Sequence, residues 1–155
     1  MIDDARFEDA QDGPIALRAL DEDDLKVISS LVQDSVLPMV EMTWDRKRRR
    51  FALLLNRFRW EDRGHVRSPE RVQAVLAIED VERVSSQGID RSEKDVVLSV
   101  LALAWRPGDE TTGRITVILA GDGAIAVDVE ALEVTLRDVT QAYGAPSGQT
   151  PAHPE

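Results

Sequence analysis

Residues 39–60 read MVEMTWDRKRRRFALLLNRFRW, and at Met39 the spacing of the apolar residues changes from the helical repeat of the preceding residues to that of a strand. Apolar side chains occupy positions 40, 42 and 44, with polar residues between them. A polar run at 45–48 follows, and residues 50–60 are again rich in apolar and aromatic groups. Alternation with a period of two is typical of half-buried strands, so this stretch predicts two strands joined by a tight turn.

The strand predicted at 50–60 is apolar on both faces in its first half. One face carries three large apolar residues and then two arginines: Phe51, Leu53, Leu55, Arg57 and Arg59. The opposite face ends in Phe58 and Trp60. We therefore expect this strand to begin in the core and to leave it as it runs.

A helix is predicted before these strands, over residues 22–35. Asp21 and Asp24 are spaced as the N-cap and the third residue of a helix, and apolar residues then recur every three or four positions. Pro38 prevents the helix from continuing. Residues 15–20, which follow Pro14, are predicted as a short edge strand.

The second half of the chain predicts further strands at 72–78, 81–89, 96–105, 115–120 and 124–129. Gly121-Asp122-Gly123 predicts a tight hairpin, because glycine tolerates positive φ. Asp128 and the apolar residues over 129–143 predict a final helix, with Gly144 as its C-cap.

The predicted fold class is α+β: a mostly antiparallel, curved sheet of six or seven strands with an N-terminal and a C-terminal helix. We expect a single globular domain over 14–144, a flexible acidic arm over 1–13 and a disordered tail over 145–155, which is rich in proline and lacks large apolar residues.

The charge of the chain is unevenly distributed. The net charge is −10, yet residues 46–71 hold ten of the nineteen basic residues and only three acidic ones. The absence of cysteine does not indicate a compartment. An acidic N-terminus and no apolar run near the roughly 20 residues of a membrane span lead us to expect a cytoplasmic protein without membrane contact.

Residue types that carry catalysis are scarce. The two histidines, His65 and His153, fall in a predicted loop and in the predicted tail. The carboxylates at 21–24 suit a helix N-terminus better than a cation site, and the glycines at 121–123 join strands rather than a strand and a helix. We expect no catalytic residue, no metal and no cofactor, and a protein-binding or adaptor role. A hydrolase using carboxylates or His65 is the enzymatic alternative.

The candidate binding residues are Arg48, Arg50, Arg57, Arg59 and Trp60, which interleave basic and aromatic side chains on the predicted hairpin. This mixture is also found where proteins bind single-stranded nucleic acid, which is therefore an alternative function. It can equally be a solvated face whose arginines pair with acidic neighbours. We favour a protein partner or a second copy of the chain, because the acidic remainder repels a polyanion.

The order of several motifs resembles an uncharacterised family of small bacterial, chiefly alphaproteobacterial, proteins that carry a domain of unknown function. The motifs are Trp44, residues 49–58, residues 71–76 and residues 121–125, and the resemblance covers about 14–144. It implies a bacterial cytoplasmic protein, with no activity, cofactor or catalytic residue to transfer. Strands closed by a C-terminal helix are also similar to the pleckstrin-homology-like fold, although here one helix precedes most strands.

Overall fold

A computed structural model describes residues 3–4, 14–58, 71–90, 92–93 and 95–139. Strands dominate them, with one α-helix, α1 (Glu22–Val32), and one short 3-10 turn, η2 (Met39–Glu41), in this part of the chain. The strands are β1 (Asp3–Asp4), β2 (Ala16–Ala19), β3 (Val36–Pro38), β4 (Met42–Asp45), β5 (Arg50–Phe58), β6 (Arg71–Ile78), β7 (Val81–Gln87), β8 (Val97–Pro107), β9 (Gly113–Leu119), β10 (Ala124–Val129) and β11 (Val134–Asp138).

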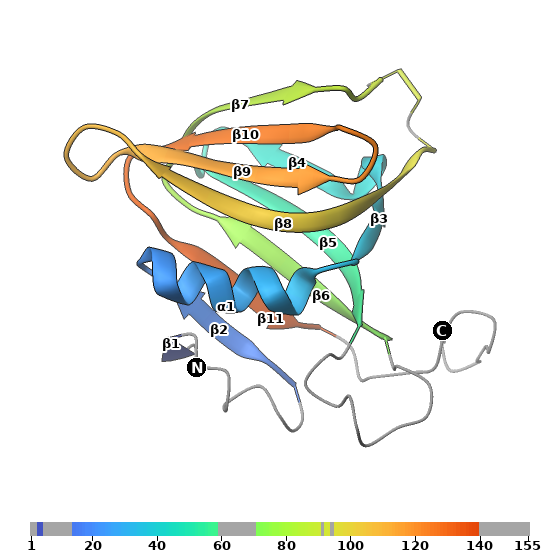
Figure 1. Ribbon diagram of the computed structural model, residues 1–155, viewed down its shortest axis with the longest axis horizontal. Coiled ribbons are helices and arrows are strands. Elements are labelled where there is room, and N and C mark those ends of the chain that lie inside the picture. The colour runs from blue at the N-terminus through green and yellow to red at the C-terminus, as the bar shows by residue number, and fades with distance from the viewer. Residues whose placement is uncertain (1–2, 5–13, 59–70, 91, 94, 140–155) are drawn as a thin grey trace.

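These strands form one 11-stranded sheet in the order β1-β2-β11-β6-β5-β3-β8-β9-β10-β7, with β4 added to β5. Among the described strands, all neighbours pair antiparallel except β1 with β2. The sheet folds over so that β2, β11, β6 and β5 form one half, and β8, β9, β10 and β7 form the other (Figure 1). Strand β3 connects the halves, since it pairs with both β5 and β8.

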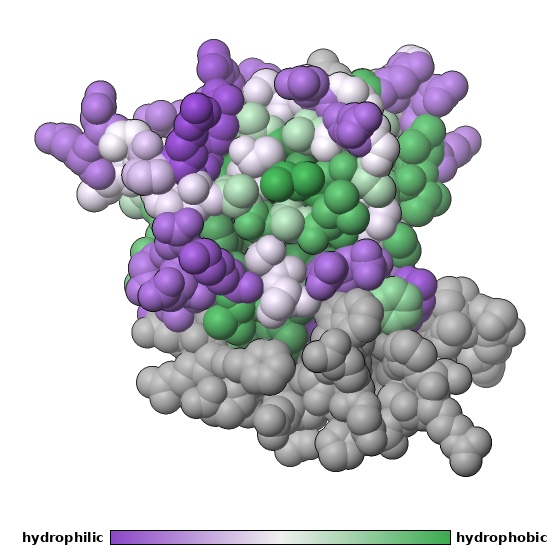
Figure 2. Space-filling model, viewed as in Figure 1, coloured by the Kyte–Doolittle hydropathy of each residue, from purple (hydrophilic) through white to green (hydrophobic). Residues whose placement is uncertain are grey.

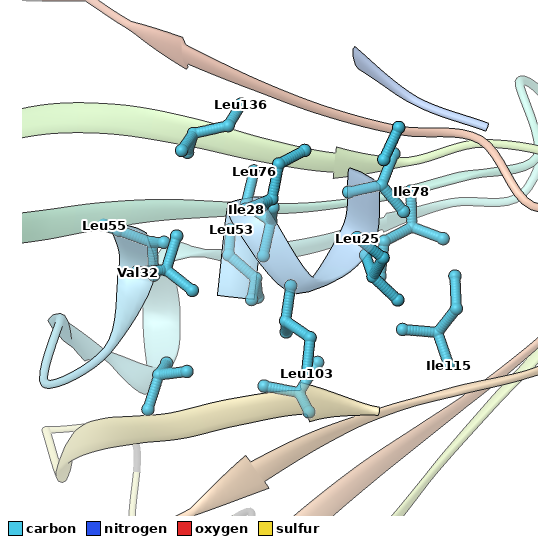
Figure 3. Packing of buried hydrophobic residues seen from close by; sticks show 14 of the residues in the cluster. Leu25, Ile28, Val32, Leu53, Leu55, Leu76, Ile78, Leu103, Ile115 and Leu136 are labelled. Atoms are coloured by element: carbon cyan, nitrogen blue, oxygen red, sulfur yellow. The ribbon is translucent and has the colours of Figure 1, made fainter. Parts of the chain in front are cut away.

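The core lies between the two halves and follows the alternation of the strands. In β5 the odd-numbered residues from Phe51 to Arg57 are buried, and the even-numbered ones are partly or fully exposed. The same alternation buries every second residue of β10. Helix α1 lies against both halves: its side chains Leu25, Ile28 and Val32 sit among core side chains of β5, β6 and β11 on one side and β8 and β9 on the other (Figure 3).

The start of α1 confirms the predicted cap. The Asp21 side chain accepts a hydrogen bond from the backbone N–H of Asp24, at 2.9 Å. The helix ends at Val32, three residues before the predicted end. Asp34 has a φ of 64°, and the chain then enters β3 with Leu37 buried, so tertiary pairing overrides the apolar repeat.

The predicted C-terminal helix over 129–143 is wrong within the described residues. Residues 134–138 form β11, in which Val134 and Leu136 are buried and Thr135 is turned away from them. This strand fills the space between β2 and β6 and pairs with both. A helix would leave the main-chain groups at those two strand edges unpaired, which explains why strand pairing prevails over the three-to-four spacing.

The predicted count of six or seven strands is also too low, since the sheet has eleven, and β1, β3 and β11 lie where no strand is predicted. The similarity to a pleckstrin-homology-like fold depended on the C-terminal helix, and it is wrong for the same reason. The hairpin at 121–123 is confirmed: β9 and β10 flank it, and Gly121 and Asp122 have φ values of 79° and 69°. The predicted arm and tail fall almost entirely outside the described residues.

The packing of α1 between the halves makes a stability prediction. Replacing Ile28, which is fully buried, by alanine should lower the free energy of unfolding by about 2–5 kcal/mol, because a cavity remains in the core. Urea denaturation followed by circular dichroism measures this difference. The matched control is Lys26→Ala on the exposed face of the same helix, and equal effects of the two substitutions would contradict the packing.

Candidate functional site

The structure separates the predicted basic cluster instead of gathering it. Arg48 lies in the β4–β5 turn, where its side chain is 73% exposed and 3.9 Å from Asp45. Arg50 is also exposed, and its Nε donates to the Glu79 carboxylate at 2.9 Å. Arg57 is buried. Arg59 and Trp60 lie outside the described residues.

Arg57 is held by Asp138 from β11. The guanidinium donates from Nε to Oδ1 and from Nη2 to Oδ2 of that carboxylate, both at 3.0 Å, and from Nη1 to the carbonyl of Phe58. The Asp138 carboxylate also accepts the backbone N–H of Ile15 at 2.9 Å. The two charged side chains are 0% and 1% exposed. A bidentate pair of this kind satisfies a charge that would be costly to bury alone.

Strand β5 therefore stays in the core as far as Arg57, which corrects the expectation that it leaves the core there. The alternation predicts that Arg57 shares a face with Phe51, Leu53 and Leu55, and the structure confirms this shared, buried face. Its partner could not be found from the sequence, since Asp138 was assigned to a helix. Arg57 does not reach the surface formed by Arg48 and Arg50.

A different site lies where the sheet fails to close. Strand β4 pairs only with β5, and β7 pairs only with β10, so each has one edge without a strand partner among the described residues. The two edges meet at one end, where the Val81 N–H donates to the Arg49 carbonyl at 2.9 Å. Away from this hydrogen bond the edges are separated by a depression, which we call the β4–β7 groove.

The open half of the groove is largely apolar. It forms a pocket of about 600 Å³. Its walls are residues of η2, β4, β5, β7 and β10 and of the segment after β7: Met39, Val40, Met42, Trp44, Arg46, Phe51, Val84, Ser85, Ser86, Ile89 and Ile125. Ser86 pairs with Ile125 and so shares the inner face of the sheet, yet it is exposed. The inner face is thus open to solvent here.

The closed half of the groove is basic. A second pocket of about 520 Å³ shares Trp44, Arg46 and Val84 with the first. It adds Arg49, Val81, Glu82 and Arg83. The two pockets are therefore consecutive parts of one groove, with Trp44 between them. Three arginines against one glutamate give its closed end a positive charge.

The arginines of the closed end differ in how firmly they are held. Arg49 pairs with Glu130 at 2.8 Å. Arg83 is 70% exposed and lies 3.4 Å from Asp128. The guanidinium of Arg46 lies 6.0 Å from the centre of the Trp44 ring, and no carboxylate lies within salt-bridge distance of it in the described part of the chain. Arg46 and Arg83 are thus the cations most accessible to a bound anion.

Asp128 connects the groove to the outer face of the sheet. Arg114, on β9, donates to Asp128 at 2.7 Å, while Arg83 approaches from β7. These two guanidinium groups, Arg114 foremost, hold the pKa of the Asp128 carboxyl below its ordinary value of 3.8. The same contact raises the pKa of Arg114. Because Arg114 is the closer partner, Arg83 is held more weakly.

Other surfaces offer less. Apolar side chains gather on the outer face of β8 and β9 (Figure 2), where Val97, Leu101 and Ile118 are exposed. No group of three or more potential metal ligands occurs in the residues that the structure describes. Likewise, no helix among them has the length and apolar character needed to span a membrane.

Sequence reasoning missed the groove. The stretch 39–60 contains three of the lining residues, Met42, Trp44 and Arg46. The two unpaired strand edges, however, depend on the order of the strands in the sheet, which the sequence pattern does not give. Ser85 and Ser86 were the available signal. They interrupt the alternation of β7 after Val84, and Ser86, which pairs with the buried Ile125, is a small polar residue on the inner face, as expected where that face is not covered.

The chain belongs to the family described as "Protein of unknown function (DUF2948)", which matches residues 15–153. No curated protein and no solved structure matches the chain significantly. The family therefore confirms the resemblance to a domain of unknown function and transfers no ligand or activity. The function is therefore inferred from the geometry of the β4–β7 groove.

The buried pair predicts a non-additive response to substitution. Arg57→Met and Asp138→Asn should each lower the free energy of unfolding by about 3–5 kcal/mol, since each leaves one buried charge unpaired. The double variant should be less destabilised than the sum by about 1–3 kcal/mol, because no buried charge remains. Urea denaturation measures the cycle. Arg137→Met, on the exposed face of β11, is the control, and simple additivity would contradict the pairing.

The depressed pKa of Asp128 predicts a pH-dependent contribution to stability. A carboxylate whose pKa is lower in the folded than in the unfolded chain stabilises the fold above its unfolded pKa and loses this contribution as pH falls through its folded pKa. Asp128→Asn should therefore cost about 0.5–1 kcal/mol at neutral pH. The difference should shrink below about pH 4. Urea denaturation across this range checks it, and a difference that grows on acidification would contradict the assignment.

Proposed function

We propose that this member of the DUF2948 family is a non-catalytic protein-binding domain that takes up an extended peptide in the β4–β7 groove. The observation that carries the proposal is the pair of unpaired strand edges on either side of an open part of the core. The bacterial cytoplasm is our proposed compartment, on the grounds of the family resemblance.

Free strand edges favour an added strand as the occupant. Beyond the Val81–Arg49 hydrogen bond, β7 makes no further backbone hydrogen bond to a described residue on the side away from β10. The edge residues of β4 and β7 thus offer N–H and C=O groups that a peptide backbone can satisfy. Such addition of a strand gives affinity through main-chain bonds and specificity through pockets for side chains.

The lining of the groove supplies those pockets. Met42, Trp44 and Val84 are partly buried and pack against the core, so an apolar side chain entering the groove would contact a surface that is already ordered. Preformed sites of this kind bind with a smaller loss of conformational entropy. A volume of about 600 Å³ accommodates one or two large side chains.

Single-stranded nucleic acid fits the described surface less well than a peptide. Of the predicted arginines, Arg57 is buried and Arg50 is paired with Glu79, so the predicted row of phosphate-binding groups is broken. The hydrolase alternative rests partly on His65, which lies outside the described residues. Self-association through the basic segment stays a prediction.

The test is selection from a library of random peptides of about seven residues, long enough to follow β7, displayed with free C-termini. We expect selected peptides, once synthesised, to shift the backbone amide signals of β4 and β7 in NMR titrations. Selection of no peptide, or shifts confined to other strands, would overturn the proposal. An oligothymidylate of about 15 nucleotides is titrated in parallel, and its binding at the arginines of 46–50 would favour the nucleic-acid alternative.

Matched variants locate the site. Ser86→Trp fills the apolar half of the groove and should weaken binding of a selected peptide by roughly tenfold or more. Gln87→Trp introduces the same side chain at an exposed position of β7 that does not line the groove. It should leave the affinity unchanged. Equal losses in both variants would mean that the peptide binds elsewhere.

A further inference from the structure

We propose that the β4–β7 groove recognises the C-terminal end of its peptide, with the terminal carboxylate bound between Arg46 and Arg83. This inference rests on the proposed function and specifies its ligand. It follows from two features of the closed end of the groove: its backbone closure and its charge.

The backbone closure determines where an added strand must stop. Strand β7 begins at Val81, whose N–H donates to the Arg49 carbonyl, and Glu130 N–H donates to the Asp80 carbonyl beside it. The β4–β5 turn, the start of β7 and the end of β10 thus come together there. A peptide that enters from the open end has no path between β4 and β7 beyond this point, so its chain either leaves the groove or ends.

The charge at the closed end indicates which terminus lies there. The pocket walls carry Arg46, Arg49 and Arg83 against Glu82. Arg49 is already paired with Glu130, whereas Arg83 is weakly held and Arg46 contacts the Trp44 ring without a described carboxylate partner. Guanidinium groups bind carboxylates through charge-assisted hydrogen bonds and would repel the ammonium group of an N-terminus.

The direction of the peptide and the position of its side chains follow. Strand β7 runs away from the closed end and β4 runs towards it, so a peptide with its C-terminus at the closed end is antiparallel to β7. Antiparallel pairing is the slightly more stable arrangement. Alternate residues before the terminus then face the apolar half, lined by Met42, Phe51 and Ile125. We expect large apolar side chains at those positions.

The experiment compares one selected peptide as its free acid and as its C-terminal amide, by fluorescence anisotropy. The free acid should bind at least roughly tenfold more tightly, because the amide offers no charge to the arginines. In Arg46→Gln the free acid should lose about tenfold in affinity and the amide little. Arg48→Gln is the matched control, because Arg48 lies in the same turn and does not line the groove.

Each alternative outcome has a distinct meaning. Equal affinity of acid and amide, with amide signals of β4 and β7 still shifting, would overturn recognition of the C-terminus and leave strand addition intact. An equal loss in Arg46→Gln and Arg48→Gln would assign the effect to general charge and overturn the site. Dodecanoate offers a carboxylate and an apolar chain without main-chain amides, and tighter binding of dodecanoate than of any peptide would overturn both proposals.

Discussion

The buried pair of Arg57 and Asp138 is the contact on which one half of the sheet, formed by β2, β11, β6 and β5, depends for its arrangement. A guanidinium with no exposed surface requires a carboxylate in fixed geometry, and that carboxylate comes from the last described strand, β11. The same carboxylate also accepts the N–H of Ile15, immediately before β2. One side chain therefore connects β2, β5 and β11. An arrangement of these strands that separated the pair would leave a charge buried alone, which is strongly destabilising.

The two sides of the folded sheet are closed in different ways. On one side α1 packs against β8 and β2 and supplies Leu25, Ile28 and Leu31 to the core. On the other side β4 and β7 diverge from the Arg49–Val81 hydrogen bond, and no described element covers the space between them. Proteins usually protect free strand edges with charges, bulges or covering segments. Here most of the charged side chains line the closed end, which is why the open half is the part suited to an apolar partner.

Local patterns in the sequence predicted the parts of the fold that depend on neighbours in the chain. Three features that follow from short-range rules are present in the structure: the helix cap at Asp21, the hairpin at Gly121 and the position of Arg57 on the inner face of β5. The C-terminal strand was missed because Leu132 and Leu136 have helical spacing, while the requirement that favours a strand comes from β2 and β6. The groove was missed for the same reason, since strand edges are free or paired only in the context of the whole sheet. Long-range pairing is the information that periodicity lacks.

The pairing of β2 with β11 has a consequence for how the chain folds. Ile15 and Asp138 exchange two hydrogen bonds, although 123 positions separate them in the sequence. Contacts between such distant residues form late, because a long loop must close before they contribute any stability. During synthesis β2 lacks its sheet neighbour β11, so the main-chain groups of that edge stay unpaired until residues 134–138 have left the ribosome. Folding of this protein should therefore be slow for its size and most vulnerable to aggregation at its N-terminal half.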